Sequence, residues 1–113
     1  MAEFDPEFKK LHAQLVNHLF DPGDDAALSA KTRAIIISVV MALQKHRTAG
    51  KHMRHAISLG ATVRELVEAM ETASIPGGFT CLHFALPHLM EIKEELDGGR
   101  FVYDPNQTVR DKQ

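Results

Sequence analysis

The sequence has no tryptophan, one tyrosine and a single cysteine, Cys81. One cysteine cannot form a disulfide within the chain or a two-cysteine redox centre, which favours a reducing compartment. A basic leader and an apolar signal segment are both missing after Met1, and the longest apolar stretch, 34–43, is interrupted by Ser38 and is too short to cross a bilayer. We therefore expect a soluble, cytoplasmic protein that does not bind membranes.

An excess of positive charge is also missing. Thirteen Lys and Arg stand against fifteen Asp and Glu, which gives a formal net charge of -2. Such a balance provides no general basic field for holding nucleic acid. We expect the partners to be a small anionic substrate and other copies of the chain, and no nucleic acid.

The length of 113 residues and the 44% hydrophobic content predict one globular domain, 1–113, with a core over about 8–96 and a polar tail over 97–113. Capping residues, helical spacing of apolar residues and Gly or Pro breaks predict five helices and no strand, an all-α fold. The expected helices run over 6–20, from a cap near 29 to about 47, over 51–59, from 62 to a break at 75–78, and over 79–96.

The second predicted helix is apolar around nearly its whole circumference, from Ile35 to Leu43. A chain of this size has a small core, which leaves too little room to bury such a helix on all sides. We expect part of 35–41 to pack against another subunit.

Histidine is the enriched residue type, with seven in the chain, and five of them lie between positions 46 and 88. His52 and His55 are three residues apart and share one helix face. Together with Arg47, Lys51 and Arg54 they form a cationic segment that suits a carboxylate-bearing ligand, because Arg binds carboxylates and His moves protons near neutral pH.

Two other interpretations of the histidines remain open at this stage. In the first, the segment is only a solvated basic face; in the second, His52 and His55 ligate zinc together with His83 or His88 as a third ligand. Neither a Cys-x-x-Cys nor a His-Glu-x-x-His motif accompanies the pair, and we expect no metal and no cofactor. Cys81 fits a small buried hydrophobe better than a reactive thiol at a helix start.

Three segments in order resemble the carboxymuconolactone decarboxylase family over most of residues 8–96. They are Leu28–Arg33 before an apolar helix, His52–Ala56 leading to Gly60–Thr62, and Pro76–Gly78. The alkylhydroperoxidase D-like branch of that superfamily carries a cysteine pair seven and four residues before the matching histidine, where this chain has Lys45 and Thr48. The chain therefore resembles the decarboxylase-like branch.

The resemblance implies a compact alkylhydroperoxidase D-like helical domain in a ring-shaped oligomer, a trimer or hexamer. It implies cofactor-free decarboxylation of a small carboxylated lactone or a related acid of aromatic catabolism. His52 is the candidate proton donor and His83 a second acid, while Arg47, Lys51, Arg54 and His55 are candidates for binding the substrate. The alternatives are an alkylhydroperoxidase-like antioxidant protein and a non-catalytic small-molecule-binding member of the family.

Overall fold

A computed structural model describes residues 5–105, which form five α-helices and contain no β-strand. The predicted all-α fold is therefore confirmed. The part of the predicted polar tail beyond residue 105 lies outside the described residues. The helices are α1 (Pro6–Phe20), α2 (Ala30–Leu43), α3 (Ala49–Ser58), α4 (Val63–Gly77) and α5 (Thr80–Asp97).

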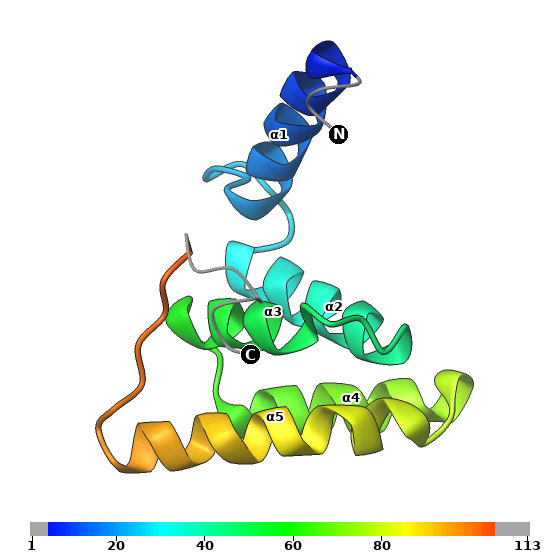
Figure 1. Cartoon of the computed structure of the whole chain (residues 1–113), viewed down its shortest axis with the longest axis vertical. Helices are drawn as coiled ribbons and strands as arrows, with labels where there is room; N and C mark the ends of the chain where they lie inside the picture. The colour runs from blue at the N-terminus through cyan, green and yellow to red at the C-terminus, as the bar shows by residue number, and fades with distance from the viewer. Residues whose placement is uncertain (1–4, 106–113) are drawn as a thin grey trace.

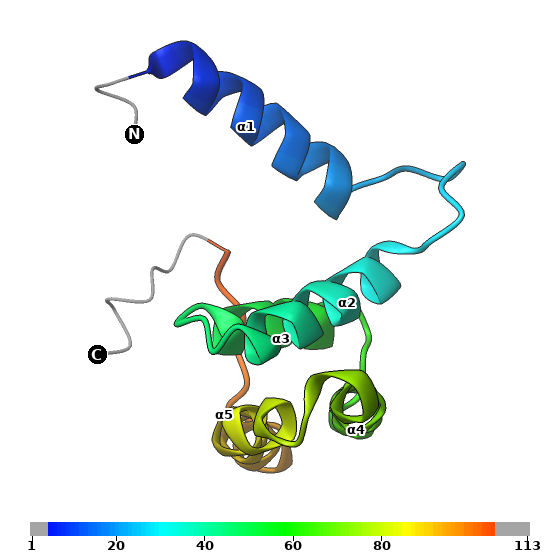
Figure 2. The ribbon, with the colours of Figure 1, turned by 90° about the vertical axis from the view of Figure 1, so that its right-hand side faces the viewer.

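The helices form two layers and one projecting arm. Helices α2 and α3 lie side by side above α4 and α5, as Figures 1 and 2 show. Helix α1 extends away from these layers and contributes no buried residue. After α5, residues 100–105 rise past the end of α3, so both ends of the described chain lie on the α3 side of the molecule.

The starts of α1, α2 and α4 follow the predicted capping signals. Asp5 accepts a hydrogen bond from the backbone N–H of Phe8 (3.0 Å), with Pro6 in the first turn of α1. Thr62 and Glu65 form a complete capping box at the start of α4. Side-chain oxygens at these positions satisfy backbone N–H groups that have no partner within the helix, which fixes where these helices begin.

Helix α2 ends at Leu43, earlier than the predicted end near Arg47. Lys45 adopts a φ of 52°, and the N–H of His46 donates to the carbonyl of Met41 (2.9 Å). This is a Schellman motif, in which a residue in the left-handed region terminates the helix. This end could not be predicted from the sequence, because a lysine occupies the position that usually holds glycine.

The same motif ends α3 and α5, and there glycine occupies the left-handed position. Gly60 has a φ of 102° and Gly99 a φ of 68°. The N–H groups of Ala61 and Arg100, which follow these glycines, donate to helix carbonyls five residues back. The predicted ends of these two helices are therefore correct to within one residue.

The sequence predicts a helix that begins after Gly50, whereas in the structure Gly50 lies inside α3. It is buried, and a Cβ atom at this position would lie 2.7 Å from Nδ1 of His88 on α5. Gly50 thus allows α3 and α5 to approach closely. Pro76 and Pro87 also lie inside helices, so the predicted break at 75–78 narrows to Gly78, with a φ of 87°.

The core between the layers is rich in small side chains, which lets the helices pack closely. Half of its buried apolar residues are alanines, whereas Ile36 and Val40 on α2 are 47% and 43% exposed. The core consists of Ala34, Ala42, Ala49, Met53, Ala56, Ala61, Leu66, Met70, Cys81, Ala85, Leu89 and Ile92.

Among residues 5–105, no helix combines the length and apolarity needed to span a bilayer.

Candidate functional site

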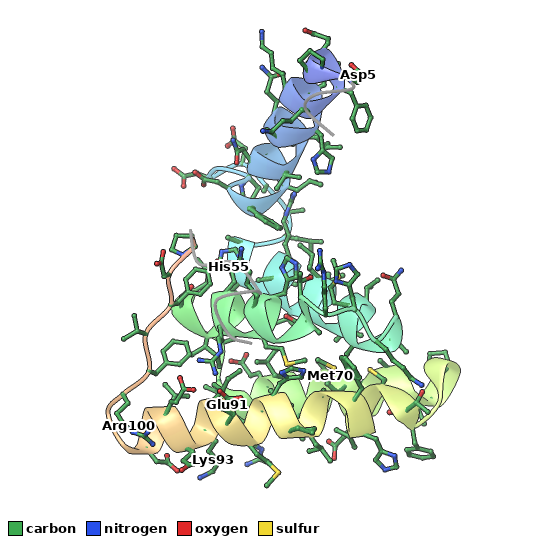
Figure 3. The ribbon with its side chains drawn as sticks, in the orientation of Figure 1. Asp5, His55, Met70, Glu91, Lys93 and Arg100 are labelled. Carbon is green, nitrogen blue, oxygen red and sulfur yellow. The ribbon has the colours of Figure 1, made fainter. Side chains whose placement is uncertain are left out.

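The outward face of α3 carries the histidine pair. Met53 and Ala56 on the inner face are fully buried, so the helical period places Lys51, His52 and His55 on the side away from the core, where each is half-buried. Figure 3 shows His55 on the side of α3 that faces away from α4 and α5. The predicted sharing of one helix face by the two histidines is therefore seen in the structure.

Two aromatic residues from distant parts of the chain border the histidines. The ring of Phe20, the last residue of α1, lies edge-on to His52 and His55, with centroid distances of 6.1 and 5.3 Å. Tyr103, in the segment that follows α5, stacks on His55 with ring centroids 5.3 Å apart. Three stretches separated in sequence thus form one site, and we call Phe20, His52, His55 and Tyr103 the histidine site.

The surroundings of both imidazoles disfavour their protonated forms. Burial lowers the pKa of His52 below its usual value of 6.5, and the neighbouring charges of His55, Lys51 and His46 lower it further. Burial and the charge of Lys51 also lower the pKa of His55. Because desolvation and positive neighbours both disfavour an imidazolium, a negative charge placed beside the rings would offset that penalty.

His46 lies just before α3 and its ring orientation is fixed locally. The backbone N–H of Thr48 donates to Nδ1 of His46 (3.1 Å), and the Thr48 hydroxyl lies 2.8 Å from the same nitrogen. Since Nδ1 accepts a backbone N–H, the ring proton of the neutral form lies on Nε2. His46 therefore presents an N–H donor at the start of α3.

Arg54 is turned inward and is held by acidic side chains of α5. Its guanidinium makes two hydrogen bonds to Glu95 (2.6 and 2.8 Å) and lies 3.3 Å from a carboxylate oxygen of Glu91. The ring of Phe101 covers it at 5.8 Å, and the residue is only 8% exposed. The guanidinium of Arg54, predicted to bind substrate, is thus engaged by acidic side chains of α5 and lies outside the histidine site.

Two further predicted site residues lie apart from the histidine site. Arg47 is exposed in the turn between α2 and α3, and His83 is exposed on α5. Within residues 5–105, neither hydrogen bonds, ion pairs nor ring contacts join them to His52. The structure thus brings together His52, His55 and Lys51 of the six predicted site residues.

The sequence interpretation missed Phe20 and Tyr103. Phe20 reads as one more apolar residue of an amphipathic helix, and Tyr103 lies in a segment without helical spacing. Their contacts with α3 depend on where the end of α1 and the segment after α5 lie in the folded chain. No local sequence pattern encodes that placement. The only available signal was compositional, because Tyr103 is the single tyrosine of the chain.

The placement of the possible metal ligands and of Cys81 bears on the sequence interpretations. Residues 5–105 contain no group of three side chains placed to hold a metal ion. Cys81 is fully buried, with its sulfur 3.6 Å from that of Met70, and burial raises the pKa of its thiol. A buried thiol with a raised pKa is a poor nucleophile, in keeping with its role as a small core residue.

A comparison with protein families places this fold and site in context. The sequence model of the carboxymuconolactone decarboxylase family matches residues 6–88, a range that includes α1 to α4, both site histidines and half of α5. Comparisons with curated proteins and with solved structures give no significant match.

Proposed function

Because the chain belongs to the carboxymuconolactone decarboxylase family, we propose that it removes carbon dioxide from a small carboxylated lactone or a related acid of aromatic catabolism. The observation that carries the proposal is the histidine site, where a half-buried imidazole pair adjoins Lys51 on an open helix face. Lysine attracts a carboxylate, and imidazole can transfer a proton without a metal or organic cofactor.

In this proposal Lys51 and His55 bind the carboxylates of the substrate and His52 delivers the proton. The bond between the carboxylate carbon and the ring breaks, and its electron pair moves into the conjugated lactone carbonyl as an enolate while carbon dioxide leaves. The imidazolium of His52 then protonates carbon, and solvent restores its proton. Cationic groups next to the forming enolate lower the energy of that step.

The surroundings of His52 fit this role electrostatically. Burial and positive neighbours lower its pKa, so its protonated form is a stronger acid than a free imidazolium. A bound dicarboxylate brings negative charge beside the ring and favours protonation when the substrate is present. Phe20 and Tyr103 fix the two rings and reduce their contact with water, which strengthens these charge interactions.

The two alternatives make different demands on the chain. A two-cysteine peroxidase would need thiols where Lys45 and Thr48 stand, and Cys81 is buried among core residues. A non-catalytic member of the family would use the same cationic face to bind an anionic metabolite without turnover. The second alternative shares every structural feature with the proposal, so turnover is what separates them.

The proposal is tested by incubating the protein with a panel of carboxylated lactones and β-keto acids and measuring carbon dioxide release. Removal of a positioned general acid costs about 10²- to 10⁴-fold in rate, so we expect His52→Gln to lower turnover on that scale. His83→Gln is the matched comparison, because His83 is exposed on α5, and we expect a change below about threefold.

Each outcome has a clear meaning. Release that depends on His52 supports the proposal, and release that depends on His83 instead moves the acid to α5. Binding of these acids, measured by calorimetry, without release from any of them would support the non-catalytic alternative.

A further inference from the structure

The ring of His46 is held at one nitrogen and is accessible at the other. Nδ1 accepts the backbone N–H of Thr48 (3.1 Å) and lies 2.8 Å from the Thr48 hydroxyl. The backbone of His46 is held as well, because its N–H donates to the carbonyl of Met41 and its own carbonyl accepts from Ala49. The residue is exposed, so the Nε2–H on the opposite side of the ring from Thr48 is available to a ligand.

Helix geometry places this ring beside the histidine site. Thr48 precedes His52 by four residues and its carbonyl accepts the N–H of His52 (3.1 Å), so the two side chains lie on one face of α3. The His46 ring contacts the Thr48 hydroxyl and is therefore about one turn, or about 6 Å along the helix axis, from the level of His52. The charge of His46 also contributes to the lowered pKa of His52, in keeping with this proximity. We call His46, His52 and His55 the histidine row.

The part of the chain that carries the histidine row has no acidic side chain. Residues 26–64 include no Asp and no Glu. The acidic side chains of α5 that reach α3 lie against Arg54. The basic side chains next to His46 along the chain are Lys45, Arg47 and Lys51. An anion that approaches the start of the row therefore meets cationic groups and an N–H donor.

We propose that His46 is a further substrate-binding residue of the histidine site and that its Nε2–H donates to a second carboxylate of the substrate. The carboxylate nature of the ligand is taken from the proposed function, on which this assignment rests. Lys51 and His55 hold one carboxylate, His46 holds the other, and His52 lies between them in the row. The preferred ligand is therefore a dicarboxylate that spans about one turn of α3.

The bond between Nδ1 of His46 and the Thr48 N–H also closes a turn, which is a purely structural role. Asparagine makes the same kind of bond to the N–H two residues later in the chain. His46→Asn therefore keeps an acceptor for Thr48 and removes the Nε2–H donor, so it separates the two roles. His12→Asn is the matched control, because His12 is exposed on α1 and its ring is stacked on Phe8.

The experiment measures binding of glutarate, a dicarboxylate that does not lose carbon dioxide, by NMR titration at pH 7. The imidazole nitrogens are followed, and the signals of His46 are those that His46→Asn removes. We expect glutarate to shift the Nε2 signal of His46 in the wild type. We expect His46→Asn to bind glutarate about tenfold more weakly at an unchanged melting temperature, and His12→Asn to bind it as the wild type does.

Two results would overturn the proposal. An Nε2 signal of His46 that does not move with millimolar glutarate means that this nitrogen binds no carboxylate. Equal affinity of His46→Asn and the wild type means that His46 serves only the turn. If His46→Asn lowers the melting temperature, the titration of the wild type still decides, because it follows the Nε2 signal in the unaltered protein.

The binding role of His46 and the proposed reaction can fail separately. Glutarate binding that depends on His46, without carbon dioxide release from any acid of the panel, supports the role of His46 and favours the non-catalytic alternative. Carbon dioxide release that depends on His52, with a KM unchanged in His46→Asn, keeps the reaction and removes His46 from the site.

Discussion

At the scale of single residues, the site depends on two imidazoles whose positions the sequence could predict and on two aromatic rings that it could not. The spacing of His52 and His55 fixes a shared helix face because an α-helix repeats every 3.6 residues. The contacts of Phe20 and Tyr103 with that face arise from the return of the chain after α1 and α5. Local periodicity therefore gave half of the site, and tertiary placement gave the other half.

The lowered pKa of His52 predicts the pH dependence of the proposed reaction. The imidazolium is the acid, so kcat/KM is expected to be highest in acid and to fall as pH rises through the pKa of the free protein, which lies below 6.5. Bound carboxylates raise that pKa, so kcat is expected to begin its fall at a higher pH than kcat/KM. Initial rates from pH 4.5 to 8.5 measure both, and a flat profile would remove His52 as the acid.

The same pKa shifts link pH to stability with a definite sign. His52 and His55 have folded-state pKa values below 6.5, so the unfolded chain binds these protons more readily than the folded chain. Their contribution to stability is complete above the unfolded pKa and is lost as pH falls through the folded pKa. Acid conditions that favour the proton donor therefore also weaken the packing around the outward face of α3.

At the scale of helices, starts and ends differed in how well the sequence predicted them. Three of the starts carry a side-chain signal, as Asp5 and Thr62 illustrate, whereas α3 and α5 begin without a capping side chain. Ends depend on one residue in the left-handed region, and only glycine announces that conformation. The end at Gly60 could therefore be predicted, whereas the end at Lys45 could not.

This difference predicts a stabilising substitution. Lys45 has a φ of 52°, a conformation that costs a residue with a Cβ about 1 kcal/mol and costs glycine little. We expect Lys45→Gly to raise the free energy of unfolding by about 1 kcal/mol and the melting temperature by about 4 °C. Thermal unfolding followed by circular dichroism at 222 nm measures the change.

The reverse change at Gly60 is the control. Its φ is 102°, and no heavy atom lies within 4 Å of where a Cβ would stand, so Gly60→Ala tests conformation without a clash. We expect it to lower stability by about 1 kcal/mol. Equal signs for the two substitutions would show that φ is not what governs these helix ends.

At the scale of the whole molecule, the charged group around Arg54 joins the two layers. Arg54 on α3 reaches Glu91 and Glu95 on α5, and Phe101 covers it from the segment that follows. That segment then carries Tyr103 to His55, so the contact that anchors α5 also positions one wall of the histidine site. An arginine predicted to bind substrate is thus part of the link between the layers.

Removal of this guanidinium should weaken the molecule more than removal of a surface cation. Arg54→Met deletes the charge from a largely buried pair and leaves two carboxylates beside each other without it, so we expect a loss of about 3 kcal/mol in urea unfolding. Lys93→Met breaks an exposed ion pair with Asp97 on α5, and exposed ion pairs contribute little to stability because water screens them. In the double variant Arg54→Met with Glu95→Leu we expect most of the loss to be recovered, because apolar packing can replace a buried ion pair. Equal losses for Arg54→Met and Lys93→Met would mean that the α3–α5 contact does not depend on this pair, and the layers would then be held by their alanine-rich packing alone.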